Sequence, residues 1–268
     1  MRLDKANCDR KFLQYYNDVP VGMGATRSHL LRILRSIDLV GWSSHEESGK
    51  LDRKALTRFA TGSTTVFKRR DVKEADTSAV SVLIDCSSSM NEDGRIQVAH
   101  GVAIQLSRIF DKAGVNFAVT GFKGHNTAQY AEQRDTGVQY RTDGEDTRLI
   151  PFKTWGESMR SASSKLGSIS YWAGSATPDY SALMLSIEDL AKQRETRKIL
   201  FVLTDADGFV PEHIRHVQNV AKQQGITIVA VGIGSQEIKQ VFDNASTAND
   251  LRDLGSASFN TLLKTLRR

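Results

Sequence analysis

The sequence has little of what would mark a secreted or membrane-bound protein. Its 268 residues include two cysteines, Cys8 and Cys86, which make no disulfide framework and lack the CxxC spacing of a zinc or redox site. No run of about 18 apolar residues is present that could span a bilayer. The first residues carry charges where a signal peptide needs an apolar stretch. These absences predict a cytoplasmic protein.

The composition is that of a globular protein whose basic residues are unevenly distributed. Apolar residues make up 40% and charged residues 25%, which is ordinary for a soluble domain. Residues 1–78 contain 15 Lys/Arg and 10 Asp/Glu, whereas residues 79–268 contain 21 of each. The excess of positive charge therefore belongs to the N-terminal part. Without a nucleic-acid-binding motif, we interpret it as a solvated helical surface rather than a contact for DNA or RNA.

The N-terminal part predicts an extension of residues 1–78 that is helical and irregular. Residues 1–24 are expected to be irregular, because a proline and two glycines interrupt them. Residues 26–39 place leucines and isoleucines on one broad stripe, which predicts an amphipathic helix that docks on another surface. A short helix within residues 51–62 and a short strand at 64–69 complete the extension.

From residue 79 onward, apolar strands alternate with helices. The strands are continuous runs rich in β-branched residues, as expected of strands covered on both faces. We predict strands at 79–86, 116–121, 147–152, 198–205 and 226–233. We predict helices at 95–113, 178–192, 212–224 and 256–266. The alternation predicts an α/β domain over residues 79–268, with a doubly wound, mostly parallel sheet and helices on both faces.

Polar residues stand where two of these strands end. Asp85 ends one strand and is followed by Ser87 and Ser89, Asp205 ends another, and Thr177 lies in a polar loop that opens a helix. Ligands of such sheets bind beyond the carboxyl ends of the strands, so we expect these five residues to converge. Two carboxylates and three hydroxyls suit Mg²⁺, or Mn²⁺ or Ca²⁺, rather than Zn²⁺ or Cu²⁺.

This set of residues indicates binding rather than catalysis. Neutral hydroxyl ligands leave a bound ion with much of its positive charge, so the ion attracts an external carboxylate to its open position. No histidine, lysine or paired acid and base accompanies the five residues as a catalytic group. We therefore expect no catalytic residues, and a metal ion that grips an acidic residue of a partner protein.

The pattern Asp85-x-Ser87-x-Ser89, with Thr177 and the LTDADG segment, resembles the metal-ion-dependent adhesion site (MIDAS) of von Willebrand factor A (vWA) domains. The resemblance implies a vWA fold, in which the two serines and the threonine contact the metal and the aspartates act largely through water. Two departures occur: Ser88 stands where that family commonly has glycine, and the second loop reads TDADG rather than TDG. Neither departure removes a ligand.

Three further segments are similar to the CobT-type subunit of aerobic cobaltochelatase. They are LDRKALTRFATGSTTVFKRR before the first apolar strand, GFKGH after the second, and VAVGIGSQ near the end. This resemblance implies a non-catalytic subunit that acts with an AAA+ ATPase of the CobS/MoxR type and allows a ring-shaped oligomer with it. Whether the complex is a cobaltochelatase or another MoxR-like machine stays open at this point.

Two alternative functions come from other features of the sequence. A metal-dependent hydrolase would use Asp85 and Asp205, and a nucleic-acid-binding protein would use the basic N-terminal segment. The second would bind DNA in a salt-dependent way without needing Mg²⁺. His213 and His216 share a helix face, but without a third ligand nearby they indicate a solvated surface rather than a metal site.

Overall fold

A computed structural model describes residues 4–34, 42–55, 64–70, 78–124 and 147–256. The chain divides into two compact units. Residues 1–34 and 77–268 form the larger unit, and residues 35–76 form the smaller one. The predicted extension of residues 1–78 is thus shared between the two units.

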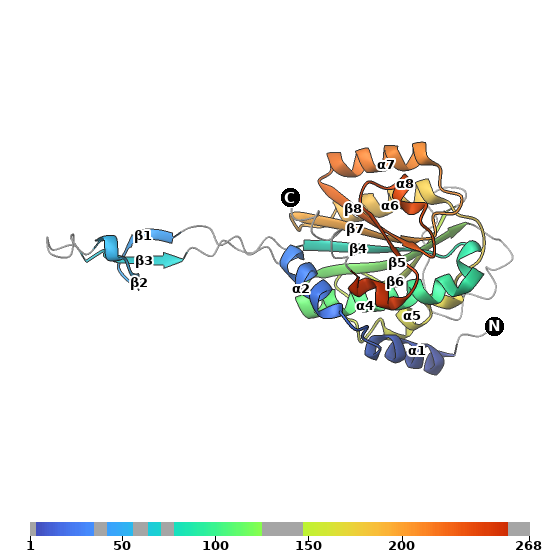
Figure 1. The fold of residues 1–268 in the computed structure, drawn as a ribbon, viewed down its shortest axis with the longest axis horizontal. Coiled ribbons are helices and arrows are strands. Elements are labelled where there is room, and N and C mark those ends of the chain that lie inside the picture. The colour runs from blue at the N-terminus through green and yellow to red at the C-terminus, as the bar shows by residue number, and fades with distance from the viewer. Residues whose placement is uncertain (1–3, 35–41, 56–63, 71–77, 125–146, 257–268) are drawn as a thin grey trace. The chain divides into compact units, whose positions relative to one another are not determined.

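The larger unit is built on a six-stranded sheet with the order β6-β5-β4-β7-β8-β9 (Figure 1). The strands are β4 (Ser78–Asp85), β5 (Asn116–Gly124), β6 (Thr147–Lys153), β7 (Arg197–Thr204), β8 (Ile226–Ile233) and β9 (Ala245–Ala248). Only the β5–β6 pair is antiparallel, and β6 lies at the edge. This arrangement confirms the predicted α/β fold with a mostly parallel sheet. β9 was not predicted.

Helices cover both faces of this sheet (Figure 1). They are α1 (Lys5–Asn17), α2 (Met23–Leu34), α4 (Arg95–Ala113), α5 (Ser163–Gly167), α6 (Asp179–Ala191), α7 (Pro211–Gln223) and α8 (Ile238–Val241). Val80, Val82 and Ile84 of β4 pack in the core with α4, whereas Ala79 and Leu83 pack in the core with α6 and α7. None of the helices in the described ranges is long and apolar enough to cross a membrane.

Helix α1 corrects the prediction that residues 1–24 are irregular. The carboxylate of Asp4 accepts a hydrogen bond of 3.0 Å from a backbone N–H of the first turn, so it caps the helix. Cys8 and Phe12, four residues apart, are the buried residues of the helix. Pro20 and Gly22 therefore lie in a short connection between α1 and α2, and Gly24 lies in the first turn of α2.

Helix α1 docks closely on α4 and α5. The side-chain amide of Gln105 in α4 donates to the carbonyl oxygens of Tyr15 and, at 2.8 Å, Asp18, at the C-terminal end of α1. On the other side, Gly167 at the end of α5 lies against the backbone of Cys8, where a Cβ atom would overlap the Cys8 carbonyl. Close packing and a buried polar contact therefore fix α1 on the larger unit.

Helix α2 realises the predicted amphipathic segment of residues 26–39 as far as the described residues extend. Leu30 and Leu34 are buried in the core of the larger unit. The helix contacts α4 and the 3₁₀ turn η6 (Leu251–Gly255). The remainder of the predicted helix lies outside the described residues. The apolar stripe thus docks on the same chain.

The smaller unit contains an antiparallel sheet with the order β1-β3-β2. Its elements are β1 (Trp42–Glu46), β2 (Lys50–Leu51), the 3₁₀ turn η1 (Arg53–Ala55) and β3 (Phe67–Arg70). β3 corresponds to the strand predicted at 64–69, whereas no strand was predicted at the position of β1. Of the helix predicted within 51–62, residues 51–55 are described: Leu51 ends β2 and Arg53–Ala55 form η1. The helix predicted at 256–266 lies almost entirely beyond the described residues.

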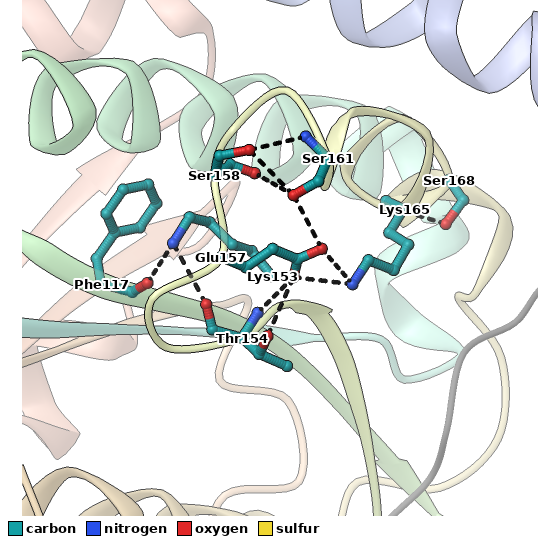
Figure 2. A network of polar contacts seen from close by, with 8 residues as sticks. All are labelled: Phe117, Lys153, Thr154, Glu157, Ser158, Ser161, Lys165 and Ser168. Carbon is teal, nitrogen blue, oxygen red and sulfur yellow. Dashed lines mark hydrogen bonds and ion pairs between the residues drawn. The ribbon is translucent and has the colours of Figure 1, made fainter.

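A polar network joins the end of β6 to α5 (Figure 2). The buried Nζ of Lys153 donates to the carbonyl of Phe117 at 2.6 Å, and burial lowers the pKa of this amine to about 8. The carboxylate of Glu157 accepts from the backbone N–H of Thr154 and from Nζ of Lys165, each at 2.9 Å. These contacts fix the path of the chain between the end of the edge strand β6 and α5.

The close approach of α1 to α5 predicts opposite effects for two helical glycines. Gly167→Ala should destabilise the larger unit by roughly 1–3 kcal/mol, because the added methyl group overpacks the contact with Cys8. Gly24→Ala in α2 meets no atom within 4 Å and should be neutral or stabilising by up to about 1 kcal/mol. Urea unfolding of both variants measures the difference, and equal effects would contradict the proposed packing.

Candidate metal centre

The carboxyl ends of β4 and β7 bring two aspartates to one edge of the sheet. The strands pair in parallel with Ile84 opposite Leu203, so Asp85 and Asp205 follow at neighbouring strand ends. Asp85 is fully buried, and Asp205 is 2% exposed. Thr204 joins the two ends, because its hydroxyl donates to Oδ2 of Asp85 at 2.6 Å.

The loop after β4 folds back onto Asp85. The backbone N–H of Ser87 donates to Oδ1 of Asp85 at 2.8 Å, which closes a tight turn. The hydroxyl oxygens of Ser87 and Ser89 are 3.0 Å apart. Two hydroxyls therefore lie side by side in the turn that begins at the buried carboxylate, as the Asp-x-Ser-x-Ser spacing predicts.

Backbone hydrogen bonds fix the third predicted loop beside the first. Two bonds of 2.9 Å join residues 174–175 to residues 86–88. A third bond, 2.7 Å long, runs from the N–H of Gly124 at the end of β5 to the carbonyl of Ala176. Thr177 follows directly, is half-buried, and lines a hollow of about 450 Å³. The structure thus places the Thr177 loop at the same sheet edge.

A buried tryptophan anchors the chain just before this loop. Trp172 is 2% exposed, and its indole N–H donates to the hydroxyl of Ser168 at 3.1 Å. Its carbonyl accepts a hydrogen bond of 3.0 Å from Nζ of Lys123, a buried lysine in β5. The loop that carries Thr177 therefore begins at a fixed point.

The electrostatics of the two aspartates favour a bound cation. Burial raises the pKa of Asp85 to about 6, the negative charge of Asp205 adds to this effect, and hydrogen bonds from Thr204 and Ser87 oppose it. Asp205 instead forms an ion pair with Arg95, whose Nη1 lies 3.0 Å from Oδ2 of Asp205. Asp85 is thus a buried carboxylate that accepts from two uncharged donors, the Ser87 N–H and the Thr204 hydroxyl.

The donor set is made of oxygen atoms. No group of three or more His, Cys, Asp or Glu suited to a metal occurs among the residues that the structure describes. Burial raises the pKa of the Cys86 thiol, so Cys86 offers no thiolate. Two carboxylates with neighbouring hydroxyls form an oxygen donor set that fits a divalent cation.

Two residues that contact the predicted aspartates, Thr204 and Arg95, were not predicted from the sequence. Thr204 precedes the expected Asp205, and its contact with Asp85 depends on strands that are distant in sequence. Arg95 begins α4, and no local motif distinguishes it from an ordinary helix-start residue. His213 and His216 flank the ring of Tyr180, with ring centroids 5.3 and 5.9 Å away, and both are exposed, as the solvated-surface interpretation expected.

A family model described as "Cobalamin biosynthesis protein CobT VWA domain" matches residues 66–267, which is most of the chain. The match includes all five predicted site residues and the whole six-stranded sheet. It begins after α1 and α2. No curated protein matches the chain.

Several solved structures are similar to this chain at low sequence identity. The pilus adhesin SpaC from Lactobacillus rhamnosus GG, in an open conformation, is 15% identical over 73% of this chain and 30% of its own, with a TM-score of 0.52. The manganese-loaded TRAP protein of Plasmodium vivax is 14% identical over 72% of this chain and 74% of its own, with a TM-score of 0.48.

Proximal thread matrix protein 1 from the mussel byssus is 17% identical over 71% of this chain, with a TM-score of 0.46. This chain spans 46% of the length of that protein. At such identities the similarity concerns the fold alone.

The burial of Asp85 predicts a pH-dependent stability difference for Asp85→Asn without metal. The folded state raises the pKa of Asp85 from 3.8 to about 6, so ionising this group costs folding free energy. The cost is absent below pH 3.8, grows as pH rises and is complete above about pH 6. The free energy of unfolding of Asp85→Asn relative to wild type should therefore increase across this window.

Urea unfolding between pH 4 and pH 7.5, in chelator, measures this difference. Asp243→Asn is the matched control, because Asp243 lies in an exposed pair with Lys222. A difference for Asp85→Asn that does not change with pH would contradict the predicted burial of charge.

Proposed function

Because this chain belongs to the family of CobT VWA domains, we propose that its larger unit is a metal-dependent protein-binding module. The observation that carries the proposal is the pair of buried carboxylates, Asp85 and Asp205, at neighbouring strand ends. Burying such groups is costly unless a cation or several donors compensate them. We propose residues 79–268 as the vWA domain and residues 1–78 as an extension that contributes α1 and α2.

Five residues would hold the ion in this proposal: Asp85, Ser87, Ser89, Thr177 and Asp205. The ion, when bound, supplies a positive charge that attracts an external carboxylate. The buried aspartates carry the negative charge that retains a cation, and the hydroxyls complete an oxygen shell without adding charge. The backbone bonds between residues 86–88 and 174–175 hold the hydroxyl-bearing loops together before any ligand arrives.

Mg²⁺ is the ion we propose, with Mn²⁺ and Ca²⁺ as the other candidates. Mg²⁺ prefers six oxygen ligands and keeps several waters, which suits a site with two carboxylates and small hydroxyls. An open coordination position would then receive an Asp or Glu side chain of a partner. No general acid or base is needed for this role, so we propose no catalysis by this chain itself.

The partner we propose is an AAA+ ATPase of the CobS/MoxR type. Family membership supports this choice, since CobT-type subunits act beside such ATPases. The chain would then be the non-catalytic subunit of a cobaltochelatase-like complex in the cytoplasm, in a ring-shaped assembly with the ATPase. The metal centre would contact an acidic residue on the surface of the ATPase.

Calorimetric titration of Mg²⁺, Mn²⁺ and Ca²⁺ tests the metal centre. Outer-shell partners alone change metal affinity by roughly 10–100-fold, so Asp85→Ala should lower it by at least about 100-fold. Asp243→Ala, at an exposed carboxylate, should leave it unchanged. Circular dichroism checks that each variant is folded. Equal metal affinity in wild type and Asp85→Ala would contradict the assignment.

The partner is tested by repeating the titration with a CobS-like ATPase present. We expect metal to bind more tightly in the complex, and the complex to dissociate in chelator. Metal binding seen only with the ATPase would mean that the partner supplies a ligand. A folded Asp85→Ala protein that still binds the ATPase in chelator would refute the metal-dependent mechanism.

A further inference from the structure

Arg95 connects the start of α4 to the predicted metal centre. Its Nη1 donates to Oδ2 of Asp205 at 3.0 Å. The Asp205 side chain is 1% exposed and that of Arg95 is 23% exposed, so the pair is largely shielded from water. Such shielding strengthens the Coulomb attraction between the two charges relative to that of an exposed pair.

The Arg95 side chain passes a glycine in the turn after β8. A Cβ built on Gly234 would lie 3.4 Å from Nε of Arg95 and 3.5 Å from its Cγ, so the arginine lies over this glycine. Gly234 has a φ of 68°, which favours glycine there. Arg95 thus lies beside the turn after β8 where its guanidinium meets Asp205.

Both oxygens of Asp205 are engaged within the chain. Oδ1 accepts a hydrogen bond of 3.1 Å from the backbone N–H of Asp207, and Oδ2 accepts from Arg95. The bond from Asp207 belongs to the loop itself, because donor and acceptor are two residues apart. The arginine is thus the one of these two donors that a side-chain rotation could remove.

Asp85 differs from Asp205 in the charge of its hydrogen-bond donors. Its oxygens accept from the Thr204 hydroxyl and the Ser87 N–H, which are uncharged donors. The two buried carboxylates are therefore unequally compensated, since a guanidinium already neutralises one of them.

We propose that Arg95 is an internal cation that competes with the metal ion for Asp205. This inference rests on the proposed function and adds a residue that controls metal affinity. Oδ1 of Asp205 is held by its own loop, so a divalent ion, or a water bound to it, would take Oδ2 in this proposal, and two cations at one carboxylate repel each other. Metal binding therefore requires Arg95 to withdraw from Asp205.

A place for the withdrawn guanidinium exists close by. Oδ2 of Asp93 lies 3.8 Å from Nη2 of Arg95, and the Asp93 side chain is 88% exposed. A small rotation of the arginine toward Asp93 would exchange a buried carboxylate for an exposed one. This exchange would move the positive charge of Arg95 to the surface near the metal.

The test is Mn²⁺ titration by calorimetry into wild type, Arg95→Gln, Arg95→Lys and Lys222→Gln. A neighbouring cation lowers the proton affinity of a carboxylate by roughly tenfold or more, and we expect a comparable effect on a metal ion. Arg95→Gln should therefore bind Mn²⁺ at least about tenfold more tightly than wild type. Arg95→Lys, which keeps the charge on a shorter side chain, should show a smaller gain.

Lys222→Gln removes the same charge from an exposed pair with Asp243 and controls for net charge. It should change the affinity by less than about twofold, because exposed charges at a distance are screened. Thermal unfolding gives a second readout. Without metal Arg95→Gln should be less stable than wild type, and Mn²⁺ should raise its melting temperature more. If Arg95→Gln folds only with Mn²⁺, that result also supports competition.

Affinity that is equal to or weaker than wild type in Arg95→Gln and Arg95→Lys would overturn the inference. If Arg95→Gln does not fold even with Mn²⁺, Arg95→Lys alone decides between these outcomes. Wild-type binding that depends on Asp85, with no gain in the arginine variants, would refute only the role of Arg95. Absence of Mn²⁺ binding in wild type and in all variants would refute the metal centre and this inference together.

Discussion

The burial of two carboxylates at the ends of adjacent parallel strands is the constraint on which the site depends. The register of β4 and β7 places Asp85 and Asp205 together, and neither can move away without breaking the sheet. Two buried like charges are unfavourable in a medium of low dielectric. The Thr204 hydroxyl, the Ser87 N–H and the Arg95 guanidinium each offset part of this cost. A divalent cation would offset the remainder, so the burial of these two carboxylates favours metal binding.

The rest of the larger unit keeps the hydroxyl-bearing loops at this edge. Trp172 fixes the start of the Thr177 loop, and the preceding segment is tied to α1, where Asp9 accepts hydrogen bonds from Ser163 and Ser164 at 3.0 and 2.7 Å. The family match begins at residue 66, so α1 lies outside it and yet packs on α5. The N-terminal helix therefore supports a segment that leads directly to the metal centre.

The sequence predicted most of the sheet because its strands are long, apolar and bounded by polar residues, as in residues 79–86 and 226–233. It also predicted that Asp85, Ser87, Ser89 and Asp205 would be near one another, since the carboxyl ends of parallel strands share an edge. It did not predict α1, whose C-terminal contact comes from Gln105, about 90 residues away along the chain. Arg95 was missed for the same reason: its role is defined by a strand end 110 residues further on.

Charge balance at the sheet edge explains how metal and partner binding would be coupled. Asp85, Asp205 and Arg95 together carry one net negative charge when Asp85 is ionised, so the metal-free site repels an acidic partner. Asp93 is left out of this sum because its side chain is 88% exposed and its charge is screened by water and salt. A divalent ion changes the sum to one net positive charge, which a single partner carboxylate neutralises. Without Arg95 the metal-loaded site would be neutral and would attract the carboxylate less. The arginine that weakens metal binding would thus strengthen partner binding once the metal is present, so that the partner and the metal stabilise each other by linkage.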